Sequence, residues 1–376
     1  MTLDVFRATV ADAEARLSRW PDWIFVSVTI VVSLALSVFF FSPNFVLWNF
    51  SLEGHFETTR ARAFLAQIES PFAPVTDVAM QWRLLPPLLA HALHLSPGAA
   101  LTIPWAGLVF LLATVVVLLR RYGLSQLQSI LGTALIATTS AVIVPTTWLG
   151  INDGWISAAL LWVAFGRSRG SLVAACLLAP WVDERFVIGF PLAFCLRQLP
   201  PNQTGPSPTL AGLLRNLVGG CLLLAPYAVA RLWLRAHLGS DQSMSFLAST
   251  LSGFIVWIPF APLGWWMAFR VAWIPLLYAA FVLRSFARGF VPAIAATTLL
   301  VITVLAADLS RSAAIVLPLL VSGLVFGVRR HPSYATRALG LLLAVNLALP
   351  ALHIVYNKCD LISPLPLELV RVFRSM

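Results

Sequence analysis

Long apolar runs separated by short polar breaks dominate the chain. A helix of about 20 apolar residues crosses the hydrocarbon core of a bilayer, so each long run predicts a membrane span. The shorter runs between 152 and 198 predict connecting turns below the membrane surface, where irregular backbone needs a protein-lined or water-filled cavity. The predicted spans lie near residues 23–42, 100–119, 127–148, 152–166, 171–182, 186–198, 212–234, 260–283, 290–307, 312–328 and 336–356.

This pattern predicts an all-α fold, a polytopic transmembrane helical bundle of about 10 to 12 spans with short or broken helices. Composition supports it, because the 376 residues are 59% hydrophobic and only 11% charged. Soluble domains carry about 25% charged residues. The loops are too short for a second domain, so residues 1–376 are expected to form one integral membrane domain. The net charge of +10 does not indicate nucleic-acid binding, since the basic residues do not gather on a soluble module.

Arginine placement predicts the orientation, because cytoplasmic loops are enriched in basic residues. With the N-terminus in the cytoplasm, most arginines fall on the inner side and every acid from Glu53 onward falls on the outer side. Residues 1–22 then form a cytoplasmic amphipathic segment and 43–99 form the first outer loop, which carries juxtamembrane helices. The tail 357–376 is expected on the outer side.

The first candidate for chemistry is the cluster Glu53-Gly54-His55-Phe56-Glu57 in the first outer loop. Two carboxylates and an imidazole within five residues can supply a general base or ligands for a divalent cation. The alternative is a solvated loop after the first span.

The second candidate is Asp183-Glu184-Arg185, which interrupts an almost wholly apolar run. Ionisable residues among membrane spans usually serve function. Arg185 suits a phosphate because a guanidinium binds such oxygens in pairs and stays charged. A structural ion pair is the alternative.

Three further positions extend the predicted outer site. Asp308 and Arg311 are neighbours on a helix at a spacing of three, and they form either a substrate site or a self-neutralising pair at a tight turn. Asn152-Asp153 is equally a turn signal and a site signal. Arg83 either contributes to the site or lies at the membrane interface and extends its charged end into water.

Several nucleotide and hydrolase motifs are absent from the sequence. It has no phosphate-cradling glycine loop, no His-Glu-x-x-His and no nucleophile elbow. Nucleotide hydrolysis by this chain is therefore not expected.

The arrangement resembles the GT-C type membrane glycosyltransferases, which take a sugar from a polyprenyl-phosphate carrier on the non-cytoplasmic face. The resemblance is carried by the first span, a long acidic outer loop and short spans joined by polar turns. Residues 82–89 (Trp-Arg-Leu-Leu-Pro-Pro-Leu-Leu) are similar to an arginine–proline stretch in many bacterial members. Residues 183–186 and 308–311 are similar to later polar breaks in such proteins.

This resemblance implies a carboxylate of the first outer loop as general base on the acceptor hydroxyl. Glu53, Glu57 and Asp77 occupy that loop. The family's paired-aspartate metal motif is replaced here by glutamate and histidine. The resemblance therefore does not decide whether the reaction uses a divalent cation. A bacterial inner membrane is the expected location, with membrane lipids and a polyprenyl-phosphate-linked sugar as partners and no cofactor that the sequence identifies.

The leading hypothesis is an inverting transferase in which Glu57 or Glu53 is the base. Arg185 and Arg311 neutralise the departing phosphate, while Asp183 and Asp308 orient these arginines or bind the acceptor. His55, Arg83, Asp153 and Glu184 are the other expected substrate-binding residues.

Other functions fit parts of the pattern. A transporter or flippase would use the polar groups as substrate sites, although such sites usually lie between pseudo-symmetric halves. A polymerase or ligase of lipid-linked glycans and a non-catalytic envelope-assembly subunit are the remaining alternatives.

Overall fold

The computed structural model describes residues 3–45, 56–73, 80–199, 209–238, 251–284 and 289–375. Helices dominate these residues, and the one sheet that they contain is a two-stranded hairpin. The elements are α1 (Leu3–Leu17), α2 (Asp22–Phe40), α3 (Phe56–Glu69), α4 (Leu85–Ala92), α5 (Pro97–Ala100), α6 (Ile103–Arg121), α7 (Gln126–Ala137), α8 (Ser140–Thr147), α9 (Asp153–Phe165), α10 (Arg169–Leu178), α11 (Arg185–Gln198), α12 (Leu210–Cys221), α13 (Ala225–Leu238), α15 (Ala261–Phe269), α16 (Trp273–Leu283), α17 (Phe290–Leu305), α18 (Leu309–Ser312), α19 (Leu317–Arg330), α20 (Pro332–Ala348), β1 (Ala351–Val355), β2 (Lys358–Ile362) and α21 (Leu365–Ser375).

The chain is an integral membrane protein with the predicted all-α helical bundle. Among the described residues, five helical segments are long and apolar enough to cross a membrane, and a sixth counts if α7 and α8, bent by 55°, form one span. Helices α9 and α17 are apolar but shorter. The expectation of short and broken helices is thereby confirmed. The five segments are Asp22–Phe40, Pro97–Arg121, Leu210–His237, Leu251–Leu283 and Leu309–Arg330.

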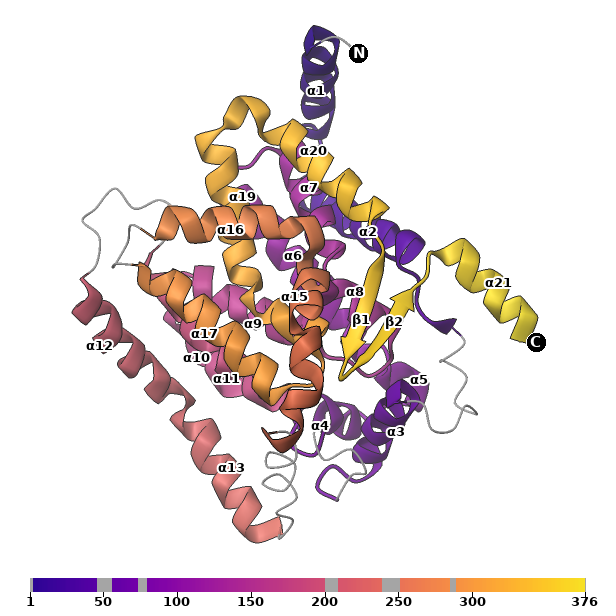
Figure 1. Ribbon diagram of the computed structural model, residues 1–376, viewed down its shortest axis with the longest axis vertical. Coiled ribbons are helices and arrows are strands. Elements are labelled where there is room, and N and C mark those ends of the chain that lie inside the picture. Colours follow the sequence, from indigo (N-terminus) through magenta and orange to yellow (C-terminus); the bar gives the residue numbers. More distant parts are fainter. Residues whose placement is uncertain are drawn as a thin grey trace.

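Burial separates a central span from a peripheral one. In the most apolar stretch of Leu309–Arg330, 89% of the residues are buried inside the protein, against 17% for Leu210–His237. Figure 1 shows the latter, helices α12 and α13, along one edge of the bundle. A helix that is apolar all round needs either a protein core or lipid around it. The core therefore surrounds α19, and most of the α12–α13 surface faces outward.

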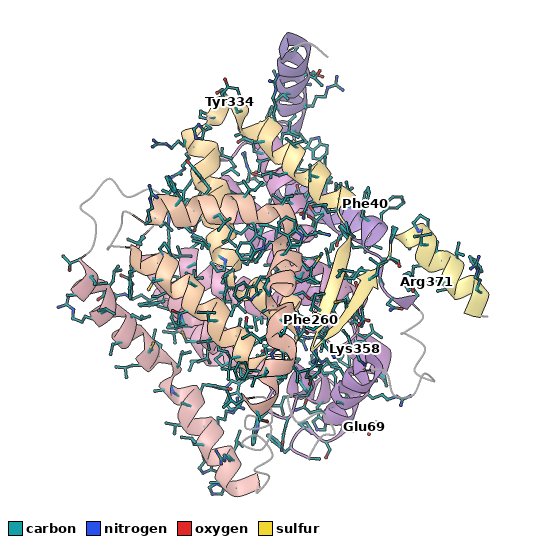
Figure 2. The ribbon with its side chains drawn as sticks, in the orientation of Figure 1. Phe40, Glu69, Phe260, Tyr334, Lys358 and Arg371 are labelled. Carbon is teal, nitrogen blue, oxygen red and sulfur yellow. The ribbon has the colours of Figure 1, made fainter. Side chains whose placement is uncertain are left out.

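The two ends of the bundle carry different parts of the chain. Figure 1 shows α1 projecting at one end, with the α19–α20 turn near it and with α3 toward the opposite end. Figure 2 labels Tyr334 near the start of α20 and Glu69 at the end of α3. Helix α1 is tied to the bundle by Glu14, whose carboxylate accepts hydrogen bonds from the Ser125 hydroxyl and the Leu127 amide at the start of α7.

The last predicted span, 336–356, is wrong in its final third. Helix α20 ends at Ala348, and residues from Ala351 form strand β1, which pairs antiparallel with β2. Pro350 explains the stop, because a proline disfavours helical backbone in the preceding residue. Leu349 is accordingly extended, with ψ of 140°. The apolar composition continues through the strand, which is why the run resembled a longer helix.

Arg270 lies at a helix break inside an apolar segment and is fully buried. Its guanidinium donates hydrogen bonds to the carbonyl oxygens of Thr138 and Leu349, and it lies 4.4 Å from the centre of the Phe41 ring. Asn346 also donates to Thr138. A buried charge needs such partners. Arg270 therefore joins the break between α7 and α8 to the end of α20.

A small residue permits a close contact between α16 and α19. A Cβ added at Gly323 would lie 1.8 Å from the carbonyl oxygen of Pro275. We expect Gly323→Ala to lower the free energy of unfolding by roughly 1–3 kcal/mol, since such overpacking forces the backbone to shift. Gly340→Ala is the matched control, because Gly340 is also helical and has open space around it. Unfolding in detergent micelles measures both, and equal stabilities would contradict the expectation.

Candidate functional site

Three aspartates lie where three helices begin. Asp153 is the first residue of α9, Asp183 lies two residues before α11, and Asp308 immediately precedes α18. Helix N-termini carry a partial positive charge that favours a carboxylate. Gly154 permits the position of Asp153, because a Cβ there would meet the backbone of Gly107 in α6 at 2.5 Å.

Arg185 connects two of these aspartates. Its guanidinium donates to both carboxylate oxygens of Asp183 at 2.8 and 2.7 Å, and to Asp153 at 2.5 Å. The backbone amide of Arg185 also donates to Asp183 at 3.0 Å. A further donor reaches the hydroxyl of Ser312 at 3.4 Å. Both partners of each contact are buried, so Arg185 is held between the starts of α9 and α11 and the end of α18.

Arg311 connects the third aspartate to the first. It forms ion pairs with Asp153 at 2.8 Å and with Asp308 at 3.1 Å, and it lies 3.9 Å from Asp183. His353 of β1 donates to Asp308 at 2.9 Å from the other side. The hairpin is fixed to this turn by backbone contacts between Asp308 and Val355.

Arg83, just before α4, completes the network. It forms two hydrogen bonds to the carboxylate of Glu184, at 3.2 and 3.0 Å, and an ion pair with Asp183 at 3.1 Å. Glu184 is partly accessible, whereas Asp183 is buried. Arg83 therefore joins the predicted first outer loop, residues 43–99, to the start of α11.

A cavity of about 10 Å³ lies within this network, with room for about one water molecule. Arg60 of α3, Arg83 and Arg311 line it together with Asp183 and Asn152. The side-chain oxygen of Asn152 is buried and has no hydrogen-bond partner among the described residues. Three guanidinium groups from separate parts of the chain thus meet at one small polar space.

The charges of this cluster balance, with four arginines and four acids: Arg60, Arg83, Arg185 and Arg311, and Asp153, Asp183, Glu184 and Asp308. Paired charges avoid most of the penalty of burial, but a pair that loses one partner is strongly destabilised. The cluster can therefore hold guanidinium groups in fixed positions away from bulk water. Such fixed groups bind a charge that develops during a reaction without having to reorganise.

The carboxylates of Asp183 and Asp308 lie in turns between helices and stay ionised. Burial by itself would raise the pKa of Asp183, but Arg185 and Arg83 outweigh it and hold the pKa well below its usual range. Burial is likewise outweighed at Asp308, where His353 and Arg311 lower the pKa. A carboxylate of such low basicity orients a cation better than it accepts a proton.

The structure brings most of the predicted site residues together. The five charged residues Arg83, Asp153, Asp183, Glu184 and Arg185 meet with Asp308 and Arg311 in one network. Glu53 and His55 lie outside the described residues. Glu57 lies in the first turn of α3, and the structure describes its backbone but not its side chain.

Two members of the cluster were not among the predicted site residues. Arg60 follows Glu57 by three residues in an amphipathic helix, and this spacing was the available signal. His353 stands alone in an apolar run, so nothing in the sequence distinguishes it from a structural histidine. Its role depends on the hairpin that brings it to Asp308.

The part of the chain that the structure describes contains no set of ligands for a resident metal ion. No group of three or more His, Cys, Asp or Glu side chains there could hold one. The predicted cation ligands at 53–57 fall largely outside that part. The arginines also disfavour a cation at the centre of the network.

Comparison with known proteins gives this chain no family. No protein-family model, no curated protein and no solved structure matches it.

Proposed function

We propose that this protein is a membrane glycosyltransferase of the GT-C type. It moves a sugar from a polyprenyl-phosphate donor to an acceptor hydroxyl on the non-cytoplasmic side of a bacterial inner membrane, and its N-terminus is cytoplasmic. The observation that carries the proposal is the convergence of Arg60, Arg83 and Arg311 on one small polar cavity inside a membrane protein.

A phosphate leaving group at the mouth of this cavity would explain why several arginines line it, since the cavity itself has room for about one water molecule. When the bond from the sugar to the phosphate breaks, negative charge grows on the phosphate oxygens. Guanidinium groups stay charged at all relevant pH values and bind such oxygens in pairs. Because carboxylates fix these arginines in advance, they can stabilise the growing charge in a site with little water.

The buried aspartates have a supporting role in this proposal. Asp183 and Asp308 are too weakly basic to deprotonate an alcohol efficiently, so they position the arginines. Arg185 donates to Asp183, Asp153 and Ser312 and acts in the same way. The general base is then Glu57, which precedes Arg60 by three residues in α3.

The proposed step is a single displacement at the anomeric carbon. Glu57 accepts the proton of the acceptor hydroxyl while the acceptor oxygen bonds to that carbon. The bond from carbon to the phosphate oxygen breaks, and its electron pair leaves with the polyprenyl phosphate. Attack from the face opposite the phosphate inverts the configuration of the sugar.

Phosphate recognition is tested by thermal stabilisation of the purified full chain. We expect farnesyl phosphate to raise the melting temperature, because a ligand that binds only the folded state stabilises it. Farnesol, which has the same chain without the phosphate, should give a smaller rise. Arg60→Gln should remove the difference between the two compounds, since it deletes a guanidinium of the cavity.

Arg62→Gln is the matched control for this experiment. Arg62 lies two residues further along α3 and is exposed, so its variant should behave like the wild type. Equal stabilisation by farnesyl phosphate and farnesol in the folded wild type would overturn phosphate recognition. An equal response of the two variants would remove Arg60 from the site.

A further inference from the structure

An apolar groove of about 200 Å³ lies between α16, α19 and α20. Figure 1 shows these three helices together, toward the end of the bundle from which α1 projects. Nearly all of the accessible wall of the groove is apolar. The groove shares no lining residue with the cavity among the arginines, so it is a separate site.

The groove opens on the outward face of the bundle. Helices α16 and α19 belong to Leu251–Leu283 and Leu309–Arg330, two of the segments that are long and apolar enough to cross a membrane. Ile274 of α16 and Tyr334 of α20 line the groove and are exposed. The outward apolar face of a membrane-spanning helix contacts lipid chains. An acyl chain therefore has both access to this groove and the chemistry to fill it.

The dimensions of the groove suit one chain segment. Along α20 its lining residues run from Tyr334 to Leu342, about 12 Å of helix. Two small residues, Gly327 of α19 and Ala338 of α20, lie along it. Its volume is below the range of about 300–1,000 Å³ that holds a whole drug-sized molecule. The groove can therefore take part of one lipid chain, and the headgroup of that lipid must lie outside it.

Basic residues lie at the α19–α20 turn, where the groove begins. His331 forms that turn and lines the groove, and Arg330 directly precedes it. Arg330 is exposed, and it forms no hydrogen bond or ion pair with any other residue that the structure describes. Helices α16, α19 and α20 contain no aspartate or glutamate. The charge at this end of the groove therefore favours an anionic headgroup.

We propose that the groove binds an anionic phospholipid, with one acyl chain between α19 and α20 and its headgroup at Arg330. A phospholipid joins an apolar chain to a charged headgroup, and the groove joins an apolar slot to an exposed cation in the same order. Basic residues at a membrane surface attract anionic lipids. A zwitterionic lipid has no net charge, so it should bind less tightly. This binding does not depend on the proposed sugar transfer.

Native mass spectrometry of the delipidated full chain measures this binding. The probes are dioleoyl phosphatidylglycerol, which is anionic, and dioleoyl phosphatidylcholine, which is zwitterionic and has the same chains. We expect the anionic lipid to bind roughly fivefold more tightly, the effect of about one arginine at a membrane surface. Arg330→Gln should remove this preference. Arg169→Gln, at an exposed position on α10, should retain it.

Gly327→Leu tests the groove itself. Gly327 lines the groove, and a Cβ added there would have open space, so the larger side chain can enter the slot without straining the helix. It should weaken the binding of phosphatidylglycerol by roughly tenfold, the effect of about two methylene groups lost from the apolar contact. Gly340→Leu is the matched control, because Gly340 is also helical with open space and does not line the groove.

Three results would overturn the proposal. Equal affinities for the two lipids in the folded wild type would exclude recognition of the headgroup. Equal affinities for phosphatidylglycerol in Gly327→Leu and Gly340→Leu would exclude the groove. A wild-type dimer that becomes a monomer in Gly327→Leu would assign the groove to a second copy of the chain. The phosphate-recognition experiment depends on Arg60, which does not line this groove, so either result can fail while the other stands.

Discussion

Replacing Arg185 by methionine is expected to lower the free energy of unfolding by roughly 3–5 kcal/mol, because it removes a guanidinium that two buried carboxylates share. Asp183 and Asp153 both accept hydrogen bonds from its guanidinium, at distances of 2.5 to 2.8 Å. Arg83 and Arg311 already pair with Asp183 and Asp153, at 3.1 and 2.8 Å, and also with Glu184 and Asp308, so they cannot take over the contacts of Arg185 as well. Unfolding in detergent micelles, followed by tryptophan fluorescence, measures the loss.

Two comparisons make this prediction specific to the network. Arg169→Met, at an exposed position on α10, should change stability by no more than about 0.5 kcal/mol. Adding Asp183→Asn to Arg185→Met should recover part of the lost free energy of unfolding, because the side chain at position 183 is then neutral. If Arg185→Met is as stable as Arg169→Met, or if the two network substitutions are simply additive, the network does not stabilise the bundle in this way.

Replacing Glu57 by glutamine is expected to lower the rate of sugar transfer by roughly 10²–10⁴-fold, the usual contribution of a positioned general base. Glutamine has nearly the same shape but cannot accept the proton of the acceptor hydroxyl. The rate is measured as polyprenyl phosphate released from a panel of polyprenyl-phosphate sugars. The melting temperature should stay that of the wild type.

Glu69→Gln is the matched control for the base. Glu69 is exposed at the last position of the same helix, so its replacement tests the effect of removing an acid from α3. Transfer at the wild-type rate in Glu57→Gln would exclude Glu57 as the base. If neither Glu57→Gln nor Glu69→Gln releases polyprenyl phosphate although both are folded, the result would favour the transporter and assembly-subunit alternatives.

The apolar pattern by itself was sufficient to predict the helices. It located spans such as α2, α6 and α9 closely, because burial in lipid or in a membrane-protein core requires long apolar segments. It also predicts one continuous span over 260–283, whereas the helix breaks at Arg270 between α15 and α16. The hairpin was missed because strand β1 is as apolar as the helix before it, although Pro350 marked the boundary.

The sequence also predicts part of the site, for a related reason. A charge within an apolar run is unusual, so the sequence alone indicates Asp153, Asp183 and Arg185. Arg60 was not noticed, because a charge on an amphipathic helix is ordinary. His353 was not noticed because it depends on a hairpin that the pattern did not reveal.

The sequence by itself determined that this is a helical membrane protein and that its short spans are joined by charged turns, since those features follow from local composition. Only the tertiary structure decided which charges meet. The pairing of Arg185 with Asp153, 32 residues away, and of Arg83 with Glu184, 101 residues away, depends on how helices pack. Coulomb attraction depends on distance in space, and no local pattern in a chain encodes that distance.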